Sequence, residues 1–195
     1  MNAKWFFPLL VFFFCLGTAS AQFTLKPYVG ANSSKLSSDF QNEEFKAGLG
    51  YQFGVDLLIG RRIYLQPGLN YELSKVGVRG SGDISDLKIS RINLPIMLGI
   101  KLFREDVDKY FDVRVFTGPT ASFLADFDGG SGLGITRSEI KNFNLAWNAG
   151  AGVDLFMFFL DIAYKWDVND FFSSGQESSS TKNVFYGNLG LRFNF

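Results

Sequence analysis

Carboxylates are the main side chains in this sequence that could do chemistry, because the chain has no histidine and only one cysteine, Cys15. Without histidine, the Ser-His and Asp-His devices of hydrolases and acyltransferases cannot form, and the usual transition-metal ligands are missing. We therefore predict no enzyme activity, no cofactor and no metal site. Calcium remains an alternative, since four acids near predicted loops offer oxygen ligands, although such acids are more often solvated: Asp126, Asp128, Asp167 and Asp170.

Two other binding chemistries are disfavoured by the sequence. The glycine-rich segment 129–134 (GGSGLG) lacks a strand-to-helix context and a following Gly-Lys-Ser/Thr, so we interpret it as a flexible loop and not as a phosphate cradle. Without Lys4, which lies in the N-terminal segment discussed below, 18 basic residues face 19 acidic ones. This balance leaves no excess of positive charge that would indicate nucleic-acid binding.

Twelve charged residues share one face of strand-like segments and form the main candidate site. If these segments close into a barrel of eight strands, its interior is just wide enough for side chains to fill it, and charges inside must be paired. We therefore predict an interior cluster of ion pairs, with a narrow proton or ion path as the less favoured alternative. The cluster comprises Lys26, Lys46, Asp56, Glu72, Lys101, Asp112, Arg114, Asp126, Asp154, Asp161, Lys165 and Arg192.

The elements that position these charges are strands, because apolar and polar residues alternate with a period of two. The second strand, 45–57, alternates over its whole length, and the sixth and seventh form a hairpin around Met157. The pattern predicts an all-β, eight-stranded antiparallel up-and-down barrel. The predicted strands are 23–31, 45–57, 63–73, 92–102, 110–127, 143–155, 158–166 and 184–195.

The predicted connections alternate in length, which is typical of an outer-membrane barrel with both termini in the periplasm. Aromatic residues at both ends of the apolar face and strands of about 9 to 11 residues or more also favour the membrane. A soluble lipocalin-like barrel, with the apolar face inside, is the alternative. The long loops are 32–44, 76–86, 128–142 and 169–183, and the short links are 60–61, 104–109 and the turn near Met157.

The two ends of the chain carry expected targeting signals. Lys4, twelve apolar residues at 5–16 and the small residues before Gln22 predict a cleaved signal peptide over 1–21; a membrane anchor is less favoured because twelve residues are too few to span. The mature barrel domain is then 22–195. The aromatic last strand resembles the assembly signal of outer-membrane barrels, carried by Leu191, Phe193 and Phe195.

Four places depart from regular alternation. Proline removes a ladder hydrogen bond and often marks a bulge, so we predict bulges at Pro67, Pro95 and Pro119. The parity of apolar residues also changes before the fourth strand, which predicts a kink or bulge near Ser90–Arg91.

Four stretches resemble the PorT-like family of small outer-membrane β-barrel proteins from Bacteroidetes: 64–71 (YLQPGLNY), 92–102 (INLPIMLGIKL), the Gly118-Pro119 step and 149–166 (AGAGVDLFMFFLDIAYKW). The resemblance covers the whole mature chain and implies the barrel more strongly than any activity, although the founding member is linked to protein secretion. It implies a Gram-negative outer-membrane location, with lipid, the barrel-assembly machinery and envelope or secretion proteins as partners.

Three functions remain open at this point. The favoured one is a structural or accessory role in the cell envelope, including secretion. The second is surface binding or adhesion through the long loops, since loops on a rigid scaffold often carry binding sites. The third is a small transport pore.

Overall fold

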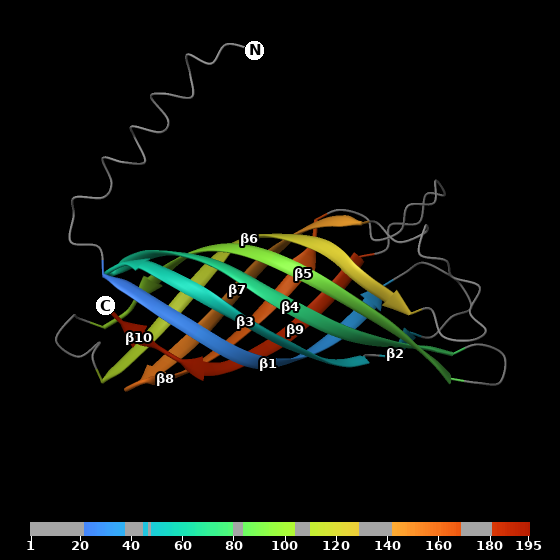
Figure 1. Cartoon of the computed structure of the whole chain (residues 1–195), viewed down its shortest axis with the longest axis horizontal. Helices are drawn as coiled ribbons and strands as arrows, with labels where there is room; N and C mark the ends of the chain where they lie inside the picture. The colour runs from blue at the N-terminus through green and yellow to red at the C-terminus, as the bar shows by residue number, and fades with distance from the viewer. Residues whose placement is uncertain are drawn as a thin grey trace, which may run out of the picture.

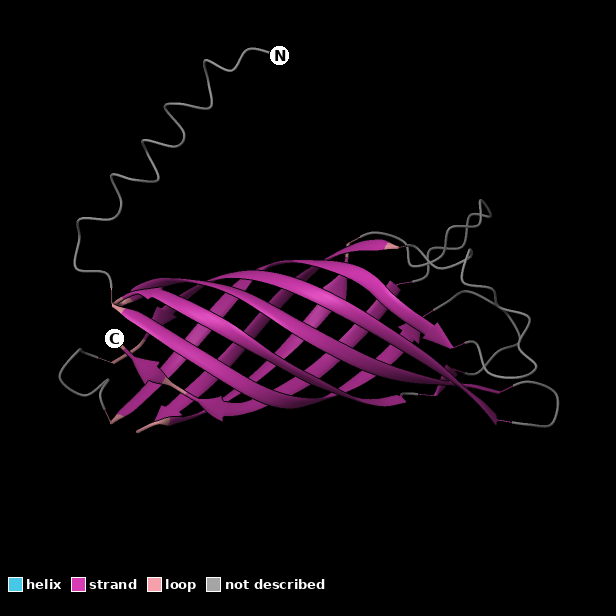
Figure 2. Cartoon of the chain, viewed as in Figure 1, coloured by secondary structure: helices cyan, strands magenta, loops and turns pink. Residues whose placement is uncertain are grey.

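The computed structural model describes residues 22–37, 45–46, 48–79, 84–103, 110–128, 142–168 and 181–195. No helix among these residues is long and apolar enough to cross a membrane. The regular structure is entirely β-strand (Figures 1 and 2). The strands are β1 Phe23–Ser37, β2 Phe45–Lys46, β3 Gly48–Gly60, β4 Ile63–Arg79, β5 Ile84–Lys101, β6 Phe111–Asp128, β7 Phe143–Leu155, β8 Phe158–Asp167, β9 Thr181–Leu191 and β10 Phe193–Asn194.

The sheet closes on itself. From β3 to β9, each strand pairs antiparallel with the next along the chain, and β1 pairs with β3 on one side and with β9 and β10 on the other. The short β2 continues β3 along β4, and β10 continues β9 along β1, so ten segments make eight strands around the barrel. The predicted eight-stranded antiparallel barrel is confirmed. Both ends of the described chain lie at one end of the barrel, which we call the termini end; the opposite end is the loop end (Figure 1).

The two faces of the sheet differ in chemistry. On β8, Leu160 and Ile162 are 47% and 46% exposed, whereas Asp161 is 3% exposed, and burial alternates along the whole strand. Because a closed barrel has only an inside and an outside, the apolar side chains face outward and the polar ones inward. The soluble alternative, with an apolar interior, is therefore wrong.

Aromatic pairs occupy the outer surface near both ends of the barrel. Near the loop end, two ring pairs have centroid separations of 5.3 Å and 6.1 Å, and two pairs near the termini end have separations of 5.3 Å and 5.7 Å. Aromatic rings with one apolar and one polar environment are favoured at membrane interfaces. The pairs are Phe123–Phe143, Tyr164–Trp166, Phe103–Phe111 and Tyr110–Phe156.

Several strands run further towards the loop end than predicted. β1 continues through the mostly polar residues 32–37, with Ser33 opposite Phe185 and Ser34 opposite Val184. β4 reaches Arg79, β5 starts at Ile84 and β9 starts at Thr181. Backbone pairing does not require apolar side chains. The alternation of apolar and polar residues therefore predicted these strands to be shorter than they are. The glycine-rich segment 129–134 and Asp170 lie outside the described residues.

The irregular positions behave differently from one another. A register shift occurs between Ser90 and Arg91 in the β5–β6 ladder, as predicted, because β6 carries one extra residue at Ala125. At the three prolines, in contrast, the predicted bulges are wrong. The register is the same on both sides of Pro67, Pro95 and Pro119. In one ladder beside each proline, two consecutive residue pairs are missing. Proline removes the donor without adding a residue.

Candidate functional site: the charged interior

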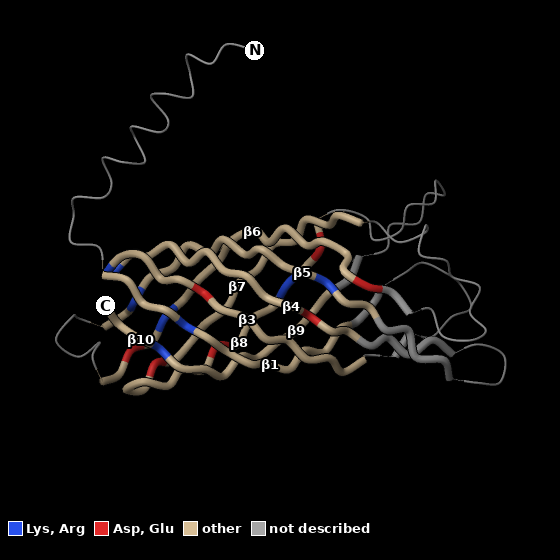
Figure 3. The backbone as a smooth tube through the Cα atoms, viewed as in Figure 1, with Lys and Arg blue, Asp and Glu red and all other residues tan. Residues whose placement is uncertain are grey.

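The interior contains twelve buried charged residues among those that the structure describes. Six are basic and six acidic, and their side chains come from all eight strands around the barrel, with Arg192 between β9 and β10 in the last strand. Figure 3 shows charged positions in two groups, one towards the termini end and one nearer the loop end. The buried set is Lys26, Asp56, Glu72, Arg91, Lys101, Asp112, Arg114, Asp154, Asp161, Lys165, Asp167 and Arg192.

Arg114 of β6 is the centre of the group at the termini end. Its guanidinium is fully buried, and Nη2 lies 2.5 Å from Oδ1 of Asp161 and 2.9 Å from Oδ1 of Asp154. Nη1 also donates to the Tyr64 hydroxyl at 3.4 Å. Burial without partners would be very costly for a charge, so the two carboxylates on β7 and β8 are what make Arg114 tolerable inside.

Two further cations extend this arrangement on either side. Lys26 Nζ lies 3.2 Å from Asp161 Oδ2 and 3.7 Å from the centroid of the Phe159 ring. Arg192 Nη1 lies 3.0 Å from Asp154 Oδ2, and its Nε donates to the carbonyl oxygen of Phe156 at 2.8 Å. The resulting termini-end network links β1, β6, β7, β8 and the last strand through Lys26, Asp161, Arg114, Asp154 and Arg192.

A second network, nearer the loop end, is centred on Glu72 of β4. Its carboxylate pairs with Lys165 of β8 and accepts hydrogen bonds from Ser74 Oγ and Asn93 Nδ2, both at 2.8 Å. Arg91 of β5 lies opposite Glu72 in the β4–β5 ladder and is also buried. This second network crosses the interior from β4 to β8, so it holds opposite walls together.

Neutral side chains fill the space between the two networks. Gln52 Nε2 donates to Asn188 Oδ1 at 2.6 Å, and Met97, Phe116 and Tyr186 pack in a buried apolar cluster. The cavity among these side chains is small, with a volume of about 30 Å³, and could hold a small number of water molecules. At this level of the barrel, side chains therefore occupy most of the interior.

The structure places ten of the twelve residues of the predicted cluster inside. Asp126 is exposed, because the extra residue at Ala125 reverses the parity of β6 beyond that point. The structure does not describe the side chain of Lys46. Arg91 and Asp167 are buried but were not predicted to be inside. The parity of β8 could have revealed Asp167, whereas the irregularity at Ser90–Arg91 hid Arg91.

The calcium alternative is not supported by the described acids. Asp126 is on the outer surface and Asp167 is inside, so they cannot share one ion. No group of three or more acidic residues within the described ranges could hold a metal.

The residues predicted as an assembly signal lie where the barrel closes. Leu191 ends β9, Phe193 pairs with Leu25 of β1, and Phe195 donates its backbone N–H to the carbonyl oxygen of Phe23 at 2.8 Å. Phe193 and Phe195 are exposed on the outer surface. The last strand thus presents Phe193 and Phe195 outward, beside the first strand.

A closed antiparallel barrel with an apolar outer surface and a charged, filled interior defines the class of outer-membrane β-barrel proteins. The comparison with known families agrees. Residues 18–173 match the family described as the outer membrane protein beta-barrel domain, and the chain belongs to this family. Comparison with curated protein sequences found no match.

Several solved outer-membrane proteins have a similar fold. The outer membrane protein OprG from Pseudomonas aeruginosa has a TM-score of 0.60 at 13% identity, covering 90% of this chain and 96% of that one. Ail, the attachment invasion locus protein of Yersinia pestis, has a TM-score of 0.54 at 15% identity, covering 87% and 98%. Neisserial surface protein A has a TM-score of 0.52 at 12% identity, covering 89% and 99%. Identities this low show the shared fold alone.

Proposed function

We propose that this protein is a non-conducting, non-catalytic structural or accessory component of the outer membrane, which acts through the surfaces at the two ends of its barrel. The observation that carries the proposal is the filled interior. Two ion-pair networks span the lumen, and the cavity between them is small, at about 30 Å³. A transport pore would need a continuous open path, and ion pairs across the lumen argue against one.

The finer assignment rests on the sequence. The resemblance to the PorT-like family of Bacteroidetes supports an accessory role in protein secretion, with both termini in the periplasm after removal of residues 1–21. In that orientation the termini end faces periplasmic partners. Leu191, Phe193 and Phe195 would meet the barrel-assembly machinery during biogenesis, since they lie on the outer face of the closing strand.

Surface binding is a second candidate, favoured by the length of the strands. β4, β5 and β6 contain 17, 18 and 18 residues, whereas about 9 to 11 residues cross a bilayer at the usual tilt. The extra length is at the loop end, where β4 and β5 remain paired up to Arg79 and Ile84. Strands that continue beyond the membrane would hold loops rigidly above the surface, as a binding module requires.

Two experiments test these functions. The first is single-channel recording of the mature protein in planar bilayers, beside the variant Arg114→Ala/Asp161→Ala. We expect no conductance steps from the wild type, and steady channels from the wild type would contradict the proposal.

The second experiment captures partners in envelopes with photo-crosslinkers, using full-length protein and a version with segments 38–44, 129–141 and 169–180 shortened to turns. An accessory component working from the periplasm should keep its partners after shortening. Loss of every partner would favour the surface-binding module instead.

A further inference from the structure

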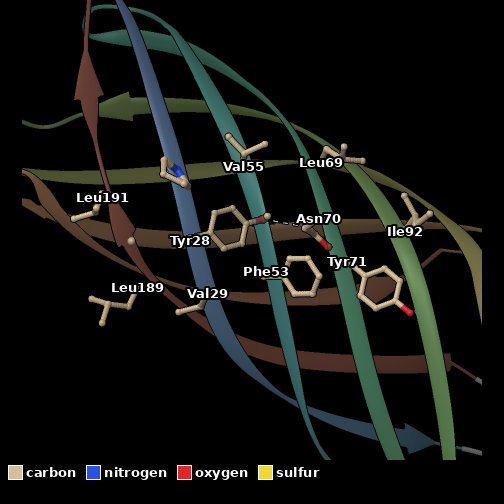
Figure 4. Close-up of a pocket in the computed structure, with 13 residues that line it drawn as sticks. Tyr28, Val29, Phe53, Val55, Leu69, Asn70, Tyr71, Ile92, Leu189 and Leu191 are labelled. Carbon is tan, nitrogen blue, oxygen red and sulfur yellow. Dashed lines mark hydrogen bonds between the residues drawn. The ribbon is translucent and has the colours of Figure 1, made fainter.

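An apolar hollow lies on the outer surface of the barrel, where the first and last strands meet. Its volume is about 720 Å³, within the range of about 300–1,000 Å³ that is usual for sites holding one small molecule. It extends across β9, β1, β3, β4 and β5 (Figure 4). A smooth lipid-facing wall would have no such site, so the hollow needs an explanation.

The hollow is lined by a row of aliphatic side chains beside a row of aromatic ones. Pro27, Val55 and Leu69 lie opposite one another on β1, β3 and β4. The next row of outward side chains on β3 and β4 is bulkier, since the rings of Phe53 and Tyr71 pack with centroids 5.5 Å apart. All five line the hollow.

The floor of the hollow coincides with an interruption in the seam that closes the barrel. The β1–β9 ladder runs from Ser37 to Tyr28, and β1 pairs with β10 at Thr24 and Leu25. No ladder pair joins residues 26–27 to residues 191–192, all four of which are described. Pro27 has no N–H to donate, and Pro27 and Leu191 both line the hollow. Two ladder pairs are therefore missing from the seam beside the hollow, as they are beside Pro67, Pro95 and Pro119.

The polar groups at the bottom of the hollow already have partners. Asn70 Nδ2 donates to the Tyr28 hydroxyl at 3.2 Å, and Asn70 Oδ1 accepts from Asn93 Nδ2 at 2.8 Å. Figure 4 shows Tyr28 and Asn70 behind the outward side chains, joined by a hydrogen bond. Since these groups are satisfied within the protein, the site selects for an apolar ligand.

We propose that the hollow binds one acyl chain of a membrane lipid, which lies against the interrupted seam between β1 and β9. The family places this face in a bilayer, where acyl chains are the molecules that reach it. A second copy of the protein fits less well, because a two-fold symmetric contact centred here would put hollow against hollow and fill neither. A flexible chain fills the concave surface and covers the seam.

The test uses the mature protein in vesicles of phosphatidylcholine that carries a photoreactive diazirine on one acyl chain. After irradiation, labelled peptides are mapped by mass spectrometry. We expect several-fold more label on outward residues that line the hollow, such as Val29 and Leu189, than on Val115, which is outward on β6, a strand that does not line the hollow. Even labelling around the barrel would overturn the proposal.

Three variants sharpen the test. Val55→Trp fills the hollow and should reduce labelling there several-fold. The matched Val115→Trp, on an outward position of β6 away from the hollow, should leave it unchanged, and equal effects would overturn the proposal. If Val55→Trp does not fold, the wild-type label distribution alone decides. Val29→Cys tests the other occupant. Efficient disulfide-linked dimers of this variant in bilayers would show a second copy in the hollow and would also overturn the proposal.

Discussion

Arg114 and Asp161 form an ion pair of 2.5 Å across β7, directly over Gly152. Gly152 is the ladder partner of both residues, since it lies opposite Arg114 of β6 and opposite Asp161 of β8. A Cβ atom at Gly152 would be 1.9 Å from Asp161 Oδ1 and 2.8 Å from Arg114 Nη2. The absence of a side chain on β7 is thus what allows charges on two non-adjacent strands to meet.

Gly152→Ala should therefore destabilise the barrel. The added methyl forces the carboxylate and the guanidinium apart in a packed interior, where overpacking costs about 1–3 kcal/mol. The free energy of unfolding, measured by urea titration in detergent micelles, should fall by that amount. Gly187→Ala is the matched control, because its Cβ would meet its nearest neighbour at 3.8 Å. Equal stability of the two variants would contradict the steric role of Gly152.

The pair of Lys165 and Glu72 should show strong coupling in a double-mutant cycle. Lys165→Met alone leaves a buried carboxylate without its cation, which costs about 3–5 kcal/mol. Adding Glu72→Gln removes the uncompensated charge, so the double variant should recover much of that loss. Additive effects in urea unfolding would show that the two side chains do not interact.

Leu98→Arg should hinder insertion into bilayers, because Leu98 is 56% exposed on the outer surface of β5. Arginine on the lipid face costs about 2–4 kcal/mol at the bilayer midplane and about 0–1 near the interface. Leu102→Arg, one residue beyond the end of β5, is the comparison and should cost less. Refolding yields into vesicles measure both, and normal refolding of Leu98→Arg would contradict the assignment of the outer face.

Most of the fold followed from the sequence because one pattern dominates it. On β8, strict alternation assigned Leu160 outward and Asp161 inward, and both assignments agree with their burial. Parity failed where the count of residues changes, as at Ala125, beyond which Asp126 moved to the outer surface. It also failed at strand ends such as Ser34, where backbone pairing continues without apolar side chains.

The partners inside the barrel could not be predicted from the sequence. Arg114 and Asp161 are 47 residues apart, and their contact depends on the register of two ladders and on the small residue between them. Parity says only that both point inward. The seam hollow was equally hidden, because it depends on which outward residues of β1, β3 and β9 become neighbours after closure.

The central claim is that the apolar face meets lipid while the polar face fills the lumen, and solution NMR in lipid nanodiscs tests it without any substitution. Methyl groups of Ile162 and Leu160 are outward, whereas those of Ala146 and Val184 are fully buried. We predict nuclear Overhauser contacts from lipid acyl-chain protons to the first pair and none to the second. Contacts from lipid to Ala146 and Val184, with none to Ile162, would contradict the account.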